Sequence, residues 1–132
     1  MKTVFLGGTC NGSLWREQLL ALLDPTMVSA FNPVVPNWTP ECQAEEIRQR
    51  ETSDICLYVI TPKMTGVYSI AEVVDDSNKR PSKTVFCFVE NDGTASFEKH
   101  QVKALNAVGK MVVANGAKSF ATLVDVAAFL NT

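Results

Sequence analysis

The chain has 132 residues and a mass of 14.4 kDa, and 46% of its residues are hydrophobic, so one compact domain over residues 1–132 is expected. Twelve lysines and arginines against fourteen aspartates and glutamates give a formal net charge of -2, which argues against a nucleic-acid partner. The apolar run in residues 1–8 is too short for a signal-peptide core or a membrane span, so a cytoplasmic protein with no membrane partner is expected.

Apolar runs alternate with amphipathic stretches along the chain, which is typical of repeated βα units. Short runs of β-branched or aromatic residues predict five strands, over Thr3–Leu6, Met27–Phe31, Ile55–Ile60, Thr84–Val89 and Ala117–Phe120. These runs lack sustained polar alternation, as expected for parallel strands that are covered on both faces.

Helices are predicted between and after these strands, over Trp15–Leu23, Thr39–Arg50, Ser69–Lys79, Ser96–Ala114 and Thr122–Leu130. Asp24-Pro25 ends the first helix, because proline cannot continue the hydrogen-bond ladder. Thr39 caps the second helix, and Thr122 caps the last one. Asn115-Gly116 supplies a left-handed stop for the fourth helix.

This order of elements predicts an α/β three-layer sandwich with a doubly wound, parallel, five-stranded sheet. The flavodoxin-like strand order 2-1-3-4-5 is the expected one. In that order the chain reverses direction between strands one and three, so the ligand crevice should lie between loops Gly7–Ser13 and Thr61–Tyr68.

The first of these loops joins a strand to a helix through three glycines and several short polar residues. Its backbone can approach a ligand closely, and N–H groups at the following helix terminus favour a phosphate or a sugar hydroxyl. The candidate binding residues here are Gly7, Gly8, Thr9, Asn11, Ser13 and Arg16. A tight turn that needs glycine for its geometry alone would explain the same glycines.

Glu72 is the candidate catalytic residue, because it lies one turn inside a helix that starts at the expected crevice. A carboxylate among apolar neighbours such as Ile70 and Val73 could act as a nucleophile or stabilise an oxocarbenium-like centre. An ordinary exposed acid near the positive end of a helix is the alternative.

The chain contains three stretches, Val4–Arg16 (VFLGGTCNGSLWR), Phe31–Trp38 (FNPVVPNW) and Tyr68–Glu72 (YSIAE), that resemble the nucleoside 2-deoxyribosyltransferase-like proteins. That superfamily includes nucleotide N-glycosidases, and the resemblance extends over most of the chain. It implies a flavodoxin-like sheet and a nucleophilic Glu72 that attacks C1′ of a 2′-deoxyribonucleoside and releases the base. A second base or water would then take the sugar.

The well-studied transferases of that family carry an aspartate that contacts the departing base, six residues before the nucleophile. Gly66 stands at that position here. Asp54 opens its strand at the wrong end to replace the aspartate. Glu45 and Glu46 could approach the crevice only if their helix leans over it, so neither is favoured.

Further substrate-binding candidates are Trp38, Gly66, Tyr68 and Ser69. Trp38 offers a ring on which a purine or pyrimidine could stack, although a loop aromatic packed on the edge of the core would look the same.

The resemblance also implies a homo-oligomer, because the family usually completes each pocket with residues from a neighbouring subunit. Asn91, Asp92 and His100 are candidates for such a contribution, although a turn without further function is the favoured interpretation of Asn91-Asp92-Gly93.

Two other function classes stay open. Cys10 and Arg16 have the C-x5-R spacing of low-molecular-weight tyrosine phosphatases, in which a thiolate attacks a phosphate held by the arginine. However, Leu14 and Trp15 place bulk in that loop. A binding protein that holds a nucleotide or an ADP-ribose-like molecule without cleaving it is the other alternative, favoured by the missing acid at Gly66.

No metal and no cofactor are expected. Cys10, Cys42, Cys56 and Cys87 are dispersed, and His100 is the one imidazole that could join them, so zinc-ligand spacing is absent. The first loop also lacks a dinucleotide fingerprint.

Overall fold

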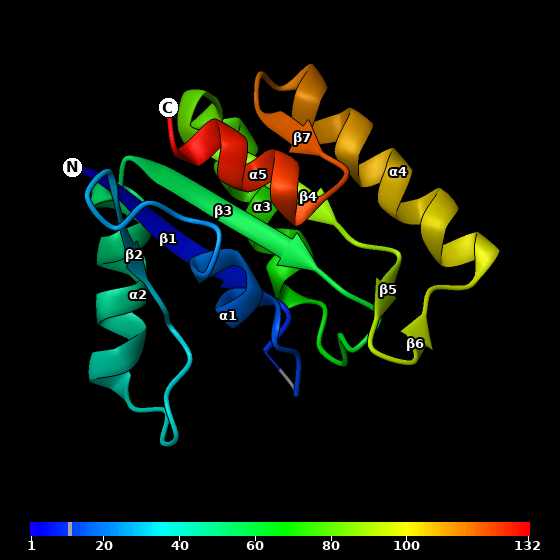
Figure 1. The fold of residues 1–132 in the computed structure, drawn as a ribbon, viewed down its shortest axis with the longest axis horizontal. Coiled ribbons are helices and arrows are strands. Elements are labelled where there is room, and N and C mark those ends of the chain that lie inside the picture. Colours follow the sequence, from blue (N-terminus) through cyan, green and yellow to red (C-terminus); the bar gives the residue numbers. More distant parts are fainter. Residues whose placement is uncertain (11) are drawn as a thin grey trace.

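The computed structural model describes residues 1–10 and 12–132, and Figure 1 shows their arrangement. One parallel sheet contains β1 (Lys2–Gly8), β2 (Val28–Phe31), β3 (Ile55–Ile60), β4 (Thr84–Phe88) and β7 (Lys118–Phe120). The strand order is β2-β1-β3-β4-β7, which is the predicted order 2-1-3-4-5. The prediction of a flavodoxin-like α/β fold is therefore confirmed.

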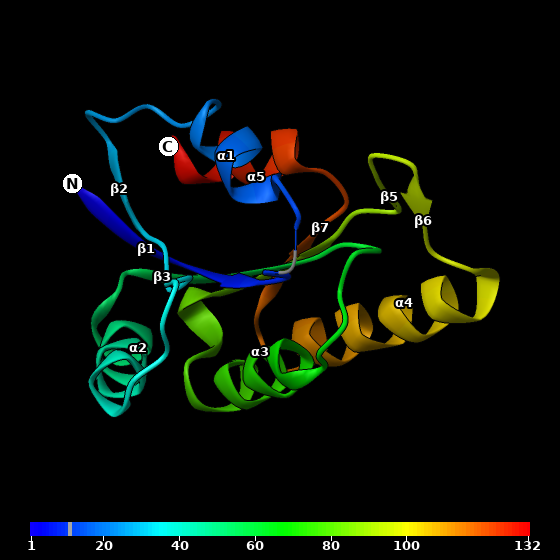
Figure 2. The same ribbon diagram turned by 90° about the horizontal axis from the view of Figure 1, so that it is seen from below.

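Helices cover both faces of the sheet (Figure 2). One face carries α1 (Trp15–Leu20) and α5 (Leu123–Leu130), and the other carries α2 (Pro40–Thr52), α3 (Tyr68–Lys79) and α4 (Lys99–Ala114). Two apolar cores result, one on each side of the sheet. All six residues of β3 are buried, which explains why its sequence is a continuous apolar run.

The predicted caps are present. The Thr39 hydroxyl oxygen accepts a hydrogen bond from the Cys42 main-chain nitrogen at 3.2 Å, and that of Thr122 accepts one from Asp125 at 3.1 Å. Gly116 has a φ of 106°, so the left-handed stop predicted after α4 is confirmed.

Two predicted helix boundaries are wrong. The α-helix of α1 ends at Leu20, and the chain continues in a tighter turn in which the Leu22 nitrogen donates to the Leu19 carbonyl at 2.9 Å. The fourth helix begins at Lys99 and not at Ser96, because residues 91–96 form a hairpin. Its two strands are β5 (Asn91–Asp92) and β6 (Ala95–Ser96).

The helix α2 differs from the other long helices in its packing. None of its residues, all of which the structure describes, is fully buried, whereas α3, α4 and α5 each bury several. It lies beneath β1 and β2 beside α3 (Figure 2). Apolar burial therefore does not fix the position of α2, and ion pairs with α3 hold it instead.

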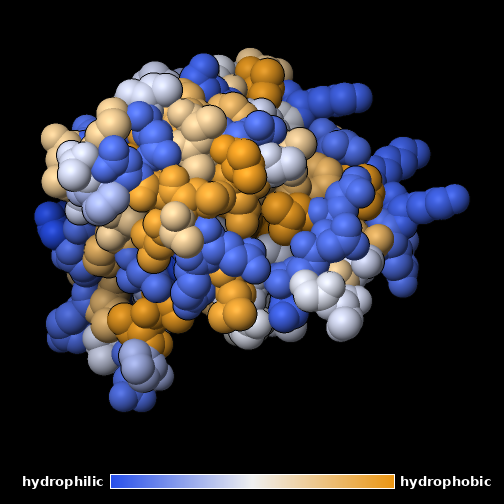
Figure 3. Space-filling model, viewed as in Figure 1, coloured by the Kyte–Doolittle hydropathy of each residue, from blue (hydrophilic) through white to orange (hydrophobic). Residues whose placement is uncertain are grey.

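The opposite face of the molecule, over α1 and α5, presents apolar patches among polar side chains (Figure 3). Leu20 and Val124 are among the exposed apolar residues of these two helices. Within the described part of the chain, no helix is long and apolar enough to cross a membrane.

Candidate active site

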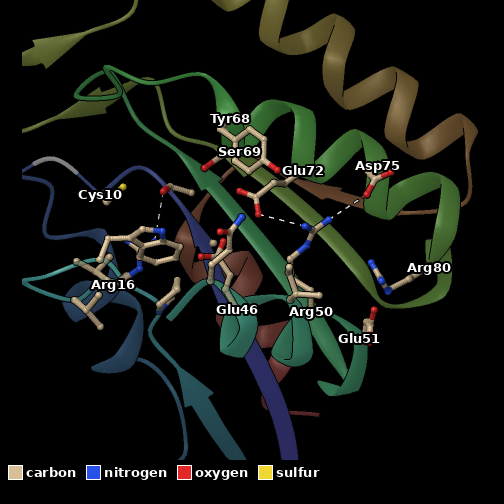
Figure 4. A pocket seen from close by; sticks show the side chains of 18 of the residues that line it. Cys10, Arg16, Glu46, Arg50, Glu51, Tyr68, Ser69, Glu72, Asp75 and Arg80 are labelled. Carbon is tan, nitrogen blue, oxygen red and sulfur yellow. Dashed lines mark hydrogen bonds and ion pairs between the residues drawn. The ribbon is translucent and has the colours of Figure 1, made fainter. Parts of the chain in front are cut away.

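A cleft of about 860 Å³ opens between the end of β1, the segment that joins β2 to α2, the helix α2 and one side of α3 along its length (Figure 4). The predicted site residues that line it are Gly7, Gly8, Arg16, Trp38, Tyr68, Ser69 and Glu72. The cleft lies at the end of β1, as predicted. Its second wall is formed by α2, and of the predicted loop Thr61–Tyr68 it is Tyr68 that lines the cleft.

Thr9 and Ser13 do not line this cleft, and their side chains contact neighbouring loops. The Thr9 hydroxyl oxygen accepts a hydrogen bond from the Thr61 nitrogen at 2.9 Å, which joins the loops after β1 and β3. The Ser13 hydroxyl donates to the Asp92 carboxylate at 2.6 Å. The structure describes Gly66, but this residue does not line the cleft. Asn11 lies outside the described residues.

The glycines at the end of β1 are required by the packing of the sheet. Gly8 has a φ of 121°, and a Cβ there would lie 2.0 Å from the main-chain oxygen of Val59. A Cβ on Gly7 would lie 2.6 Å from the Tyr58 ring. The packing of the sheet is therefore enough to explain these two glycines. Because neither has a side chain, main-chain atoms line the cleft at this point.

Arg16 is directed at the main chain. It is 5% exposed, its Nε and Nη2 donate to the Leu6 carbonyl at 3.1 and 2.9 Å, and its Nη1 donates to the Thr9 carbonyl at 2.7 Å. The guanidinium also lies 4.4 Å from the centre of the Trp15 ring, and burial lowers the pKa of Arg16 to about 10. This arrangement favours a structural role over the predicted contact with a ligand phosphate.

Glu72 extends from the second turn of α3 toward the cleft, and its carboxylate is turned toward Arg50 (Figure 4). It is 7% exposed. Its Oε2 lies 3.5 Å from Nη1 of Arg50, which extends from α2. A carboxylate on one side of the cleft is thus paired with a cation from the other side.

Glu46 is the second carboxyl group at this point, and it also comes from α2. It lines the cleft and shares a hydrogen bond with the Glu72 carboxyl. Burial raises the pKa of Glu72 to about 8, aided by the charge of Glu46 and opposed by that of Arg50. At neutral pH the two carboxyls therefore retain one proton between them.

Sequence reasoning set Glu46 aside because the tilt of its helix was unknown. In the structure α2 does form a wall of the cleft, and Glu46 faces it. Glu45, its neighbour, instead pairs with Arg48 on the surface.

Arg50 links α2 to α3. Its Nε and Nη2 donate to the Asp76 carboxylate at 3.2 and 2.9 Å, and Nη2 also donates to Asp75 at 3.2 Å. Asp76 is fully buried and accepts further hydrogen bonds from Arg80 and from the Tyr58 hydroxyl. Burial alone would lower the pKa of Arg50, but Asp76 raises it above its usual value, so the guanidinium stays charged.

Sequence reasoning missed this network. The signal that could have found it is the spacing of Glu72, Asp75 and Asp76, which places three carboxylates on one face of a helix. Such a face needs a cation from a neighbouring element, and Arg50 on the preceding helix supplies it.

The β2–α2 segment gives the cleft an apolar rim. Trp38 lies on this rim with a 55% exposed side chain, and Val34 and Val35 beside it are also exposed. Trp38 is therefore not packed on the edge of the core, and its ring is available to a planar ligand.

The phosphatase alternative lacks support from the geometry. Cys10 is exposed and lines the cleft, but the hydrogen bonds of Arg16 go to main-chain carbonyls and not toward an anion beside that thiol. Among the described residues no group of three or more His, Cys, Asp or Glu side chains is placed to hold a metal ion.

Asp92 and His100, which were candidates to complete the pocket of a neighbouring subunit, contact residues of their own chain. Asp92 bonds Ser13 and lies 3.7 Å from the Lys63 ammonium, and His100 lies 3.4 Å from Glu98.

The sequence profile of the family described as nucleoside 2-deoxyribosyltransferase like matches residues 1–91. The chain belongs to this family. No curated protein and no solved structure matches the chain significantly. Every residue named as lining the cleft falls within the matched segment, the last being Arg80. Membership in this family supports nucleoside glycosyl transfer and the binding of a small nucleoside-type molecule.

Proposed function

We propose that this protein cleaves the N-glycosidic bond of a 2′-deoxynucleoside or its nucleotide through Glu72, and passes the sugar to another base or to water. The observation that supports it is the position of Glu72 in a cleft of a deoxyribosyltransferase-like chain, 3.5 Å from Arg50. A carboxylate in that position can attack C1′ and form a glycosyl ester.

Arg50 assists this step by favouring the ionised form of Glu72, since an adjacent cation stabilises a carboxylate. The sugar would lie between Glu72 and the bare backbone at Gly8, and the base would lie toward the exposed ring of Trp38.

A nucleoside is the better substrate candidate than a 5′-monophosphate. The cations that line the cleft in the described part of the chain already have partners. Arg16 bonds main-chain carbonyls, Arg50 and Arg80 bond Asp76, and Lys79 lies 3.1 Å from Asp75. A phosphate would have to compete with these contacts.

The test is release of free base from a panel of deoxynucleosides and their 5′-monophosphates, with and without an acceptor base, followed by chromatography. Glu72→Gln should reduce turnover by about 10³-fold or more, because it removes the nucleophile. Glu45→Gln, on the outer surface of α2, is the matched control and should be unaffected. Normal turnover in a folded Glu72→Gln protein would refute the covalent mechanism.

A non-catalytic nucleoside-binding protein is the second candidate. It is favoured by Gly66, which stands where the transferases carry the aspartate that contacts the base. Calorimetric binding of a nucleoside by the wild-type protein, with no base released from any donor, would establish this alternative.

We also propose that the protein is a homo-oligomer. Tyr68, which lines the cleft, and Val67 before it are 72% and 70% exposed, and a second copy could cover them. Light scattering after size-exclusion chromatography measures this, and a monomer at assay concentrations would contradict it.

A further inference from the structure

A departing nucleobase needs a proton, because a base that leaves as an anion is a poor leaving group. Gly66 provides no acid for this step. The cleft does, however, contain a second carboxyl group beside the proposed nucleophile. Glu46 extends from α2 into the same cleft and shares a hydrogen bond with Glu72.

The position of Glu46 matches the side on which the base would lie. Trp38 and Glu46 both line the cleft, Trp38 just before the N-cap of α2 and Glu46 in the second turn of that helix. A base on the Trp38 ring would therefore lie beside the wall that carries Glu46, while Glu72 approaches the sugar from α3 (Figure 4).

We propose that Glu46 is the general acid and base of this site, a role that rests on the proposed function of Glu72. In the first step a Glu72 oxygen bonds to C1′, the C1′–N bond breaks, and the Glu46 carboxyl gives its proton to the departing base nitrogen. In the second step the ionised Glu46 takes a proton from water or from an acceptor base, which bonds to C1′ as the Glu72 ester bond breaks. Each cycle returns the pair to its starting state, in which the two carboxyls share one proton.

The charged groups around Glu72 support a proton that is shared between the two carboxyls. Glu72 is faced by Glu46 and Arg50 from α2, by Asp76 from its own helix, and by the Tyr58 hydroxyl from β3. Arg50, its cationic neighbour at 3.5 Å, stabilises the ionised form of Glu72, so the proton that the two carboxyls share can pass from Glu72 to Glu46 through their hydrogen bond. Arg16 also acts on Glu46, but its guanidinium is directed at main-chain carbonyls. Two carboxyls with one proton are the usual requirement for glycosidic cleavage.

The test compares two donors with different needs for protonation. One is a purine 2′-deoxynucleoside, and the other is a 2-deoxyriboside whose leaving group is a nitrophenolate, which departs without an added proton. Glu46→Gln should slow release of the purine by about 10²–10⁴-fold and release of nitrophenolate by less than about 10-fold. Glu72→Gln should abolish both reactions, and Glu45→Gln, on the same helix, should change neither.

The pH profile gives a second readout. For the purine donor, kcat/KM of the wild-type protein should fall at alkaline pH as the pair loses its proton, and this fall should be absent in Glu46→Gln. Equal losses for both donors, or a Glu46→Gln protein with wild-type rates, would refute the role of Glu46 while leaving that of Glu72 intact. A wild-type protein that releases neither leaving group would refute the proposed function, and this inference with it.

Discussion

Arg50 should be the residue on which the position of α2 depends most strongly. Its guanidinium makes two hydrogen bonds to Asp76 and one to Asp75, and lies 3.5 Å from Glu72. Since α2 has no fully buried residue, these contacts replace the apolar packing that holds other helices. Arg50→Met removes them while keeping most of the volume of the side chain.

The expected cost is about 3 kcal/mol of unfolding free energy, at the lower end of the range of about 3–5 kcal/mol for breaking a buried ion pair. The lower end applies because Asp76, although fully buried, keeps its hydrogen bonds from Arg80 and the Tyr58 hydroxyl. Arg48→Met is the matched control on the same helix. Its ion pair with Glu45 joins side chains that are 59% and 40% exposed, so solvent screens the pair and Arg48→Met should leave the unfolding free energy almost unchanged.

Urea unfolding followed by circular dichroism measures both variants, and hydrogen exchange of the α2 amides shows whether this helix opens first in Arg50→Met. A double-mutant cycle with Asp76→Asn should give a coupling energy above about 1 kcal/mol. The reasoning fails if Arg50→Met is no less stable than Arg48→Met, because the network would then contribute nothing to the position of α2.

Three further predictions concern the cleft. The folded-state pKa of Glu72, about 8, lies above the ordinary value of 4.5, so its stabilising contribution is complete below pH 4.5 and is lost as the pH rises through 8. Glu72→Gln should therefore flatten the decline in unfolding free energy between these limits, and an unchanged slope in urea titrations would contradict the assignment. Arg16→Ala should lower Tm and weaken a nucleoside and its 5′-monophosphate equally, since its hydrogen bonds go to main-chain carbonyls. A larger loss for the monophosphate in steady-state kinetics would show a phosphate contact instead. Trp38→Ala should raise KM for every base by a similar factor if its exposed ring stacks on the base, and an unchanged KM would exclude that role.

Most of the fold could be predicted because its signals are local. The buried strands are continuous apolar runs, and the threonines before α2 and α5 and the glycine after α4 occupy the predicted cap positions. The hairpin at residues 91–96 was missed because it has two residues per strand, too few to show alternation.

The candidate site was less predictable, and the reason lies in α2. A helix without a fully buried face has no clear apolar stripe, so its sequence does not show which side faces the sheet. Glu46 and Arg50 could therefore not be placed in the cleft, whereas Glu72 could, because it follows a strand whose end fixes its location.

The network around Arg50 connects the stability of the fold with the chemistry proposed for the cleft. One guanidinium binds the buried Asp76, which positions α2, and also approaches Glu72, whose ionisation the reaction requires. The helix placed in this way carries Glu46 to the same point. A Cβ on Gly66 would meet no atom of the described residues within 4 Å, so steric crowding does not explain the missing aspartate. Because α2 brings a second carboxyl to Glu72, the site can hold a transferable proton without an acid at position 66.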